Sequence, residues 1–249
     1  MTPIVTAVTP EYLIGLRALR NSWFQNSSSG FSFHVIGYGD EVFEQQLLTE
    51  FDNVIMNPEI RASLPCAEKC PEPNPAMYSR LLIPDLFSEH EKSVYIDADA
   101  VILKPLNGLM DLDLEEYPVA GIESWAPTSK ECLGLNKNTK GIMSALMIFN
   151  HEWWRRKDIL NRCYQVMNEG RYHFKTVVQA VLQLVLLEDW YRLPPFSQVQ
   201  GAHESTVREI GNAYVLHFAG LNPWEPYPAD WGVQPAHKDR HRAIWRSYL

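Results

Sequence analysis

The chain has 249 residues, of which 46% are hydrophobic and 21% charged, a composition that supports a folded core and excludes an intrinsically disordered chain. Its net charge of -8 argues against a nucleic-acid-binding protein, because phosphate backbones are bound by clustered Lys and Arg. For the same reason a phosphate-bearing ligand would need a cation or a local basic pocket, which favours a divalent metal ion.

The first half of the chain alternates strands and helices. Thr9 and Pro10 indicate a helix start, because a hydroxyl can cap a helix and proline suits its first position. Asn74 and Pro75 repeat this signal further on. We expect strands at 3–8, 31–38, 53–56 and 92–96, and helices at 13–23, 40–50 and 77–87.

The second half is less regular. We expect strands at 119–122, 144–149 and 214–218, helices at 153–169 and 177–187, and a tail rich in Pro and Trp. The alternation in the first half predicts an α/β fold, with a parallel or mixed sheet and helices on both faces. In such folds ligands bind beyond the carboxyl ends of the strands. No repeat or convincing linker divides the chain, which favours one domain over residues 1–249.

No apolar stretch reaches the roughly 18 residues of a membrane span, and the amino terminus lacks the basic, then apolar, pattern of a secretory signal. Of the four cysteines, Cys66 and Cys70 stand near zinc-ligand spacing, but no second pair follows at a fitting interval. We therefore expect reduced thiols in a cytoplasmic protein rather than a zinc site.

The segment KSVYIDADAVILKPL carries the main chemical signal. In an extended chain, side chains two residues apart point the same way, so Asp97 and Asp99 can face one point. Two such carboxylates suit a hard divalent cation bound through oxygen, although a capped turn would also explain them. A second copy of the pattern, Asp111 and Asp113, follows a turn signal and is interpreted as a solvated helix start.

Four blocks in order resemble glycosyltransferase family 8, the group that contains glycogenin and the bacterial lipooligosaccharide galactosyltransferases. They are VTAVTPEYLIGLRALRNSW, SRLLIPDLF with KSVYIDADAVILKPLNGL, KGIMSALMIFNHEWW, and VLHFAGLNPW. The resemblance implies a GT-A type nucleotide-diphospho-sugar transferase fold, with a Rossmann-like mixed central sheet flanked by helices. Residues 1–105 would form the nucleotide-binding half and residues 106–249 the sugar and acceptor half.

The resemblance also implies roles on the nucleotide side of the site. Backbone groups of Ala7, Val8 and Thr9 would line the uridine pocket. Tyr12 would stack on uracil, since an aromatic face suits a planar base. Ala98 would lie beside the ribose. From the residues alone, Tyr12 could equally be packed at the start of a helix.

For the diphosphate, the resemblance implies that Asp97, Asp99 and His217 bind Mn2+ or Mg2+. Gly220 would let the backbone approach the β-phosphate, and Arg80 would lie near the donor phosphates and sugar. Without the resemblance, Arg80 could be an exposed helix charge, and His217 a hydrogen-bonded residue of the core.

Three departures from the family pattern fall on the sugar side. Met143 and Ala145 replace the asparagine and glycine of the family's FNSG motif. The family's Asp-Gln pair corresponds to Val178 and Gln179. The closing motif is one residue short and lacks its lysine, and Asn222 occupies the nearest place.

The resemblance implies a metal-dependent glycosyltransferase that moves a hexose from a UDP-sugar to an unknown glycan, lipid or protein acceptor, with UDP-glucose and UDP-galactose as the first choices from the family. The family retains anomeric configuration. Gln179 is the catalytic candidate near the anomeric carbon, by position only, and Arg80 would assist the leaving diphosphate. Trp224 and Trp231 are candidate acceptor contacts.

Two alternatives remain from the sequence. One is a nucleotide-sugar-binding homologue that has lost turnover. The other is a haloacid dehalogenase-type phosphatase, in which Asp97 would be the nucleophile and Asp99 the acid. The oligomeric state is open.

Overall fold

The computed structural model describes residues 1–26, 29–62, 64, 74–124, 134–135, 139–169, 177–200, 210–218, 222–226 and 235–249. Its centre is a seven-stranded sheet in the order β3-β2-β1-β4-β7-β6-β8, beside a three-stranded sheet in the order β5-β10-β9. The strands of the large sheet are β1 (Thr2–Val8), β2 (Phe31–Gly37), β3 (Val54–Met56), β4 (Lys92–Ile96), β6 (Val119–Ser124), β7 (Gly141–Asn150) and β8 (Tyr191–Arg192). Those of the small sheet are β5 (Ala100–Ile102), β9 (Gln198–Gln200) and β10 (Val215–His217).

The four strands β3, β2, β1 and β4 are mutually parallel, whereas β7 runs antiparallel to both β4 and β6. The sheet is therefore mixed, as expected, and strands from both halves of the chain share it. The strands predicted at 3–8, 31–38, 53–56, 92–96, 119–122, 144–149 and 214–218 are all confirmed to within a few residues.

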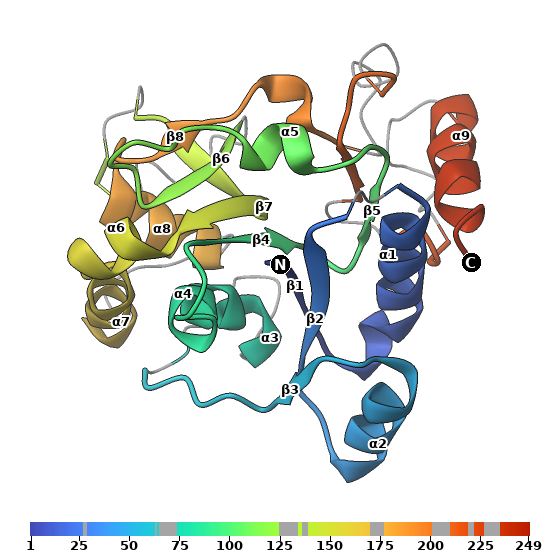
Figure 1. Ribbon diagram of the computed structural model, residues 1–249, viewed down its shortest axis with the longest axis horizontal. Helices are drawn as coiled ribbons and strands as arrows, with labels where there is room; N and C mark the ends of the chain where they lie inside the picture. The colour runs from blue at the N-terminus through green and yellow to red at the C-terminus, as the bar shows by residue number, and fades with distance from the viewer. Residues whose placement is uncertain are drawn as a thin grey trace.

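Helices cover both faces of the large sheet, with α6, α7 and α8 grouped at one end and α1, α2 and α9 at the other (Figure 1). None of the helices in the described part of the chain is long and apolar enough to cross a membrane. The α-helices are α1 (Leu13–Asn26), α2 (Glu41–Glu50), α3 (Pro75–Tyr78), α4 (Ile83–Leu86), α5 (Asn107–Met110), α6 (His151–Arg156), α7 (Ile159–Glu169), α8 (Val177–Leu186) and α9 (Pro235–Arg246). The 3-10 helices are η1 (Pro10–Tyr12), η2 (Ser79–Leu82) and η3 (Pro195–Ser197).

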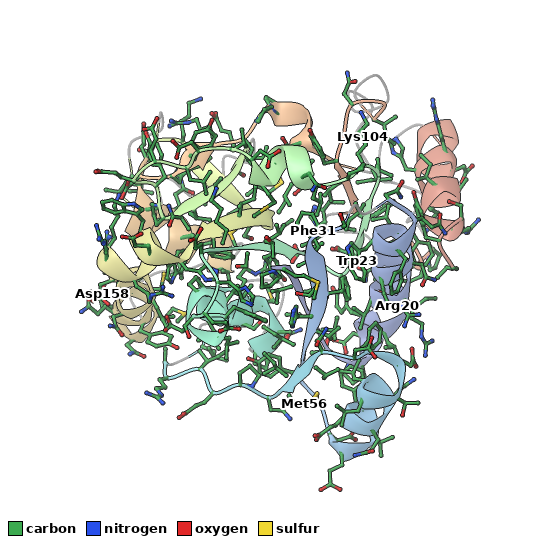
Figure 2. The ribbon with its side chains drawn as sticks, in the orientation of Figure 1. Arg20, Trp23, Phe31, Met56, Lys104 and Asp158 are labelled. Carbon is green, nitrogen blue, oxygen red and sulfur yellow. The ribbon has the colours of Figure 1, made fainter. Side chains whose placement is uncertain are left out.

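The core has two layers because strand side chains alternate between the faces of the sheet. On β1, Val5 and Ala7 join one hydrophobic cluster, and Ile4 and Val8 join the other. The second cluster also receives side chains from α1 and β2, and Figure 2 shows Trp23 and Arg20 on α1 and Phe31 on β2.

The helix predicted at 77–87 was wrong as one continuous helix. The structure divides this segment into α3, η2 and α4. Pro84 explains the break, because proline has no N–H to donate and its ring clashes with the carbonyl four residues earlier. The expected cap is present: the Asn74 side chain accepts a hydrogen bond from the Ala76 N–H at 2.9 Å.

Two predictions in the second half also need correction. The helix expected at 153–169 is divided into α6 and α7 at Asp158, whose φ of 52° lies in the left-handed region. Asp111 and Asp113 are exposed, as expected of a solvated segment, but they follow the short helix α5 rather than starting a helix. The tail contains α9, which the sequence pattern did not indicate.

Candidate metal and nucleotide-sugar site

The site lies where the strand order of the large sheet reverses. The chain leaves β1 toward β2 on one side, while β4 pairs with β1 on the other, so the carboxyl ends of β1 and β4 are neighbours. A pocket of about 410 Å³ opens beyond these ends, within the size range of ligand sites. Its lining residues are Ala7, Thr9, Glu11, Tyr12, Asn74, Ala76, Met77, Arg80, Tyr95, Asp97, Ala98, Asp99, Asn222 and Glu225.

Asp97 and Asp99 stand in a tight turn between β4 and β5. The Ala100 N–H donates to the Asp97 carbonyl at 3.1 Å, and the Asp97 N–H donates to the Ala145 carbonyl at 3.0 Å. The expectation that an extended chain brings the two carboxylates together was therefore wrong. A turn does so, at the point where the chain passes from β4 in the large sheet to β5 in the small one.

Gly15 on α1 allows the helix to approach this turn closely. A Cβ atom at Gly15 would lie 2.5 Å from the Ala98 carbonyl oxygen and 2.7 Å from the Trp224 ring. Real Cβ atoms do not approach other atoms so closely, so only glycine fits here. The helix therefore packs directly against the backbone that carries Asp97 and Asp99.

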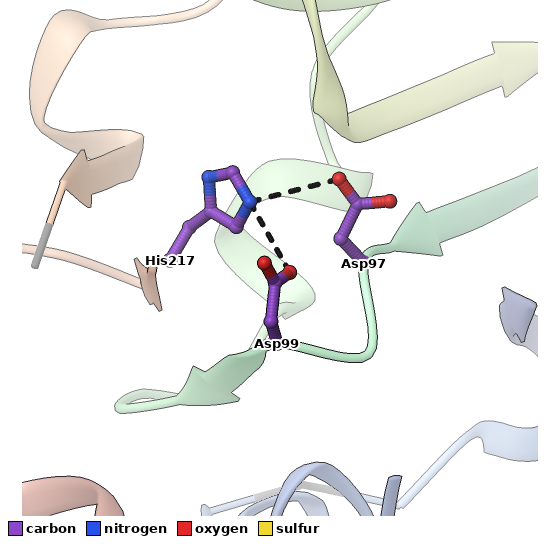
Figure 3. Close-up of side chains that lie close together, drawn as sticks. All are labelled: Asp97, Asp99 and His217. Carbon is purple, nitrogen blue, oxygen red and sulfur yellow. Dashed lines mark ion pairs between the residues drawn. The ribbon is translucent and has the colours of Figure 1, made fainter. Parts of the chain in front are cut away.

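His217, at the end of β10, completes a three-residue cluster with Asp97 and Asp99 (Figure 3). Its Nε2 atom lies 3.2 Å from Asp99 Oδ1 and 3.6 Å from Asp97 Oδ2. One ligand atom from each residue lies within 4.8 Å of the others. The pairing of β10 with β5 sets this geometry, since His217 is opposite Ala100 in the register.

The electrostatics of the cluster fit a cation. Burial opposes a charge on His217, but the Asp99 carboxylate, followed by Asp97, outweighs it and raises the pKa of the imidazole. Burial also opposes a charge on Asp99, yet His217 holds the pKa of that carboxyl below its usual value. Two oxygen donors and one imidazole suit Mn2+ or Mg2+.

Arg80 and Tyr95 hold Asp97 in place. Asp97 Oδ1 accepts a hydrogen bond from the Tyr95 hydroxyl at 2.7 Å and lies 3.0 Å from the Arg80 guanidinium. The guanidinium lies over the Tyr95 ring and donates to the Ser144 carbonyl at 2.6 Å. Arg80 lines the pocket, but it is buried and its charge is committed to Asp97, so it is not an exposed helix charge.

Tyr12 forms part of an aromatic wall. The Trp224 ring meets it edge-on at 5.7 Å between centroids and also packs against Trp245. Burial, and next the charge of Asp99, raise the pKa of the Tyr12 hydroxyl to about 12, so it stays protonated. Trp224, a candidate acceptor contact, is thus packed between Tyr12 and α9. Trp231 lies outside the described residues.

The remaining sequence candidates fall in different places. Val8 is buried and is not among the lining residues, and its carbonyl accepts a hydrogen bond from the Tyr38 N–H. Gln179, on α8, donates to the Ser124 hydroxyl at 2.8 Å and is not among the lining residues. Asn222 lines the pocket and donates to Glu225 at 3.0 Å. Gly220 lies outside the described residues, as do Cys66 and Cys70.

Sequence reasoning missed several residues of the site. Tyr95 could have been found, because it lies near the end of β4, two residues before Asp97. Asn74 was noticed only as a helix cap, although it also lines the pocket. Nothing in the local sequence distinguishes Glu225, or Gln198, whose side chain reaches His217.

Comparison with known proteins is consistent with this site. Residues 3–227 match the family described as Glycosyl transferase family 8. General stress protein A of Bacillus subtilis is 31% identical over 125 residues, which are 48% of this chain and 44% of that protein. Glycosyltransferase GlyB of Streptococcus pneumoniae is 24% identical over 188 residues, which are 70% of this chain and 42% of that protein. The chain thus spans less than half the length of both curated relatives.

Among solved structures, galactosyltransferase LgtC in complex with donor and acceptor sugar analogs has a TM-score of 0.73 at 18% identity, covering 99% of this chain and 96% of LgtC. GlyE of Streptococcus pneumoniae has a TM-score of 0.68 at 16% identity, covering 99% of this chain and 59% of that one. These likenesses establish the GT-A fold. The family match covers most of the chain, so the phosphatase alternative has no support. The chain belongs to glycosyl transferase family 8.

Proposed function

We propose that this chain is a glycosyltransferase that transfers a hexose from a UDP-sugar to an acceptor, with retention of configuration, and that it depends on a divalent cation held by Asp97, Asp99 and His217. The observation that carries the proposal is the convergence of these three side chains beside a pocket of nucleotide-sugar size. The acceptor class, whether glycan, lipid or protein, stays open.

The charge of the pocket supports the need for a cation. Among its described lining residues Arg80 is the only cation, and it is already paired with Asp97. Glu11 and Glu225 add further negative charge. A diphosphate would be repelled from such a pocket unless a divalent ion bridged it to the acids. When bound, Mn2+ or Mg2+ would also stabilise the negative charge that develops on the leaving diphosphate.

The nucleoside would lie over the carboxyl end of β1. Thr9 supports this placement, because its buried hydroxyl has no hydrogen-bond partner among the described residues, although it lines the pocket. A uracil or ribose group would satisfy that hydroxyl. The Tyr12 ring offers a flat face for the base, and the backbone of Ala7 borders the same space.

The sugar side supports a second candidate function, in which the protein binds a nucleotide-sugar without transferring it. Met143 and Asn222 replace the family's asparagine and lysine, and Gln179 bonds to Ser124. For turnover, Gln179 would have to leave Ser124 and reach the anomeric carbon, with Arg80 orienting the diphosphate through Asp97. Loss of that movement would leave a binding protein.

Thermal unfolding with and without Mn2+ and UDP-sugars tests the proposal. We expect UDP-glucose or UDP-galactose to stabilise the protein only when Mn2+ is present, and Asp99→Asn and His217→Ala to abolish the effect. Asp111→Asn is the matched control, because Asp111 belongs to the exposed second copy of the motif and should behave as the parent. Equal stabilisation of the Asp99→Asn protein would refute the metal site.

Turnover separates the two candidate functions. The transferase should release UDP from the donor faster than the His217→Ala variant does, and should do so only with Mn2+. A protein that binds the donor with Mn2+ but leaves it intact over many hours would instead be a nucleotide-sugar-binding homologue.

A further inference from the structure

Gln198 lies behind the imidazole of His217, on the side away from the acids. It is the first residue of β9, which pairs with β10. Its side-chain amide nitrogen lies 3.2 Å from His217 Nδ1 and 2.9 Å from the Met143 sulfur. Gln198 and His217 are each only 5% exposed, so water does not compete freely for this contact.

The two nitrogens of His217 have separate tasks. Nε2 faces Asp99 and Asp97, as Figure 3 shows, and is therefore the atom that a cation would contact. A metal-bound neutral imidazole uses the lone pair of that nitrogen, so its single hydrogen must be on Nδ1. This hydrogen points toward Gln198 and needs an acceptor there.

The side chain of Gln198 has an acceptor that could take this hydrogen bond. Its carbonyl oxygen, Oε1, is buried without a hydrogen-bond partner among the described residues. A half-turn of the amide about its last side-chain bond exchanges Oε1 and Nε2 while the rest of the side chain stays in place. The exchange gives up a weak contact to the Met143 sulfur, and pairs the orphaned oxygen with the His217 Nδ1 hydrogen.

We infer that Gln198 is a positioning residue for the metal site: its Oε1 accepts a hydrogen bond from Nδ1 of His217 and so keeps Nε2 aimed at the cation. This inference rests on the proposed metal site. Partners of this kind fix both the tautomer and the ring orientation of metal-binding histidines, and their loss weakens metal binding about 10- to 100-fold.

The test is a titration of the protein with Mn2+ alone, following the free-ion signal by electron paramagnetic resonance. Gln198→Met keeps the length and bulk of the side chain but offers no good acceptor, and should raise the Kd for Mn2+ at least about tenfold. Gln198→Glu retains an acceptor at the same place and should bind Mn2+ at least as tightly as the parent, within about threefold. Met143→Leu removes the sulfur contact to Gln198 while keeping a side chain of similar bulk, and should bind Mn2+ like the parent.

Several results would overturn the inference. It fails if Gln198→Met binds Mn2+ like the parent, or if Gln198→Met and Gln198→Glu weaken binding equally. Should Gln198→Met not fold, Gln198→Asn, which withdraws the amide by one methylene, carries the same expectation. If the parent binds no Mn2+, or Asp99→Asn binds it as tightly, the proposed metal site fails and this inference with it. If the parent binds Mn2+ as expected and the Gln198→Met protein binds it equally well, the positioning role of Gln198 is refuted while the proposed metal site stands.

Nuclear magnetic resonance of 15N-histidine-labelled protein gives a reading that does not depend on variants. With Mg2+ bound, the ring of His217 should carry its hydrogen on Nδ1, and the Gln198→Met protein should lose the strong downfield shift of that hydrogen. A hydrogen found on Nε2 in the Mg2+-loaded parent would contradict the inference.

Discussion

The two sides of the pocket differ in how their polar groups are satisfied. On the metal side, Asp97, Asp99 and His217 face one another, and their charges converge where a cation would fit. On the side where the resemblance would put the sugar, Asn222 lines the pocket and donates to Glu225. Gln179 lies outside the lining residues and donates to Ser124, so both side chains have a partner inside the protein. The contrast teaches that the three charged side chains depend on one another or on a cation, whereas Gln179 and Asn222 each have a separate partner.

The largest effect should come from removing the buried charge that supports the metal side. Arg80→Met leaves Asp97 without its cation, and breaking a buried pair costs about 3 kcal/mol or more of unfolding free energy. Arg17→Met is the control, because its pair with Glu50 is partly exposed and should cost less than about 1 kcal/mol. Urea unfolding of both variants measures the difference. Similar losses would mean that the Arg80 pair is no more important than a surface one.

The second prediction concerns the contact of His151, in the second half of the chain, with Ser93 and Phe87 in the first half. His151, which follows β7, is buried; its Nδ1 donates to the Phe87 carbonyl and its Nε2 accepts from Ser93 on β4. Burial, and next the charge of Arg155, lower the pKa of His151 to about 4. Below about pH 6.5 the His151 imidazole is therefore protonated in the unfolded chain but stays neutral in the folded protein. The free energy of unfolding should fall by up to about 3 kcal/mol as the pH drops from about 6.5 to about 4.

Melting temperatures across this pH range, measured for the parent and for His151→Asn, check the effect. The variant should be less stable at neutral pH but should lack this part of the pH dependence. A nuclear magnetic resonance titration that placed the His151 pKa near or above 6.5 in the folded protein would contradict the prediction.

The third prediction concerns the contact between Gly15 on α1 and the turn that carries Asp97 and Asp99. Gly15→Ala should destabilise the protein by about 1 to 3 kcal/mol and weaken Mn2+ binding, because the new methyl group would clash with the Ala98 carbonyl and push α1 away from the turn. Alanine otherwise favours a helix over glycine, so a loss of stability is specific to the clash. Gly211→Ala, at a position with open space, is the control. A Gly15→Ala protein that is as stable as the parent would contradict the prediction, because it would show that the turn can move to accommodate the methyl group without a loss of stability.

The smallest effect is expected on the sugar side. Asn222→Lys restores a cation where the family motif has lysine, and should tighten binding of a UDP-sugar by about fivefold, or roughly 1 kcal/mol. Added salt should reduce the gain, because the position is exposed. Isothermal titration at low and high salt, with Asn222→Gln as the uncharged control, measures it. Weaker binding by the lysine variant would indicate that Glu225 captures the new charge.

Much of the fold could be predicted because its signals are local. The strand at 92–96 follows from a short apolar run, and Pro10 marks the start of the first helical segment. The hydroxyl cap expected from Thr9 was wrong, because that side chain makes no cap hydrogen bond. The break at Pro84 was also within reach of the sequence. Asp158 was not, because a left-handed residue without glycine depends on its tertiary surroundings.

The site was only half accessible to sequence reasoning. Asp97 and Asp99 are identified by their spacing after a strand, although a turn rather than an extended chain unites them. His217 comes from a distant segment, and its place depends on the pairing of β10 with β5, which no local pattern encodes. Only the family resemblance pointed to it. Gln198 has neither a motif nor a resemblance, so the three-dimensional contact alone identifies it.

The turn that carries Asp97 and Asp99 lies where the chain leaves the seven-stranded sheet and enters the three-stranded one. A cation bound there would link the two sheets, which do not share hydrogen-bonded strands. A ligand that binds only the folded state adds its binding free energy to stability. Binding of the ion would therefore also raise the free energy of unfolding of the protein. Cation supply would then govern how long the folded chain survives, as well as how fast it works.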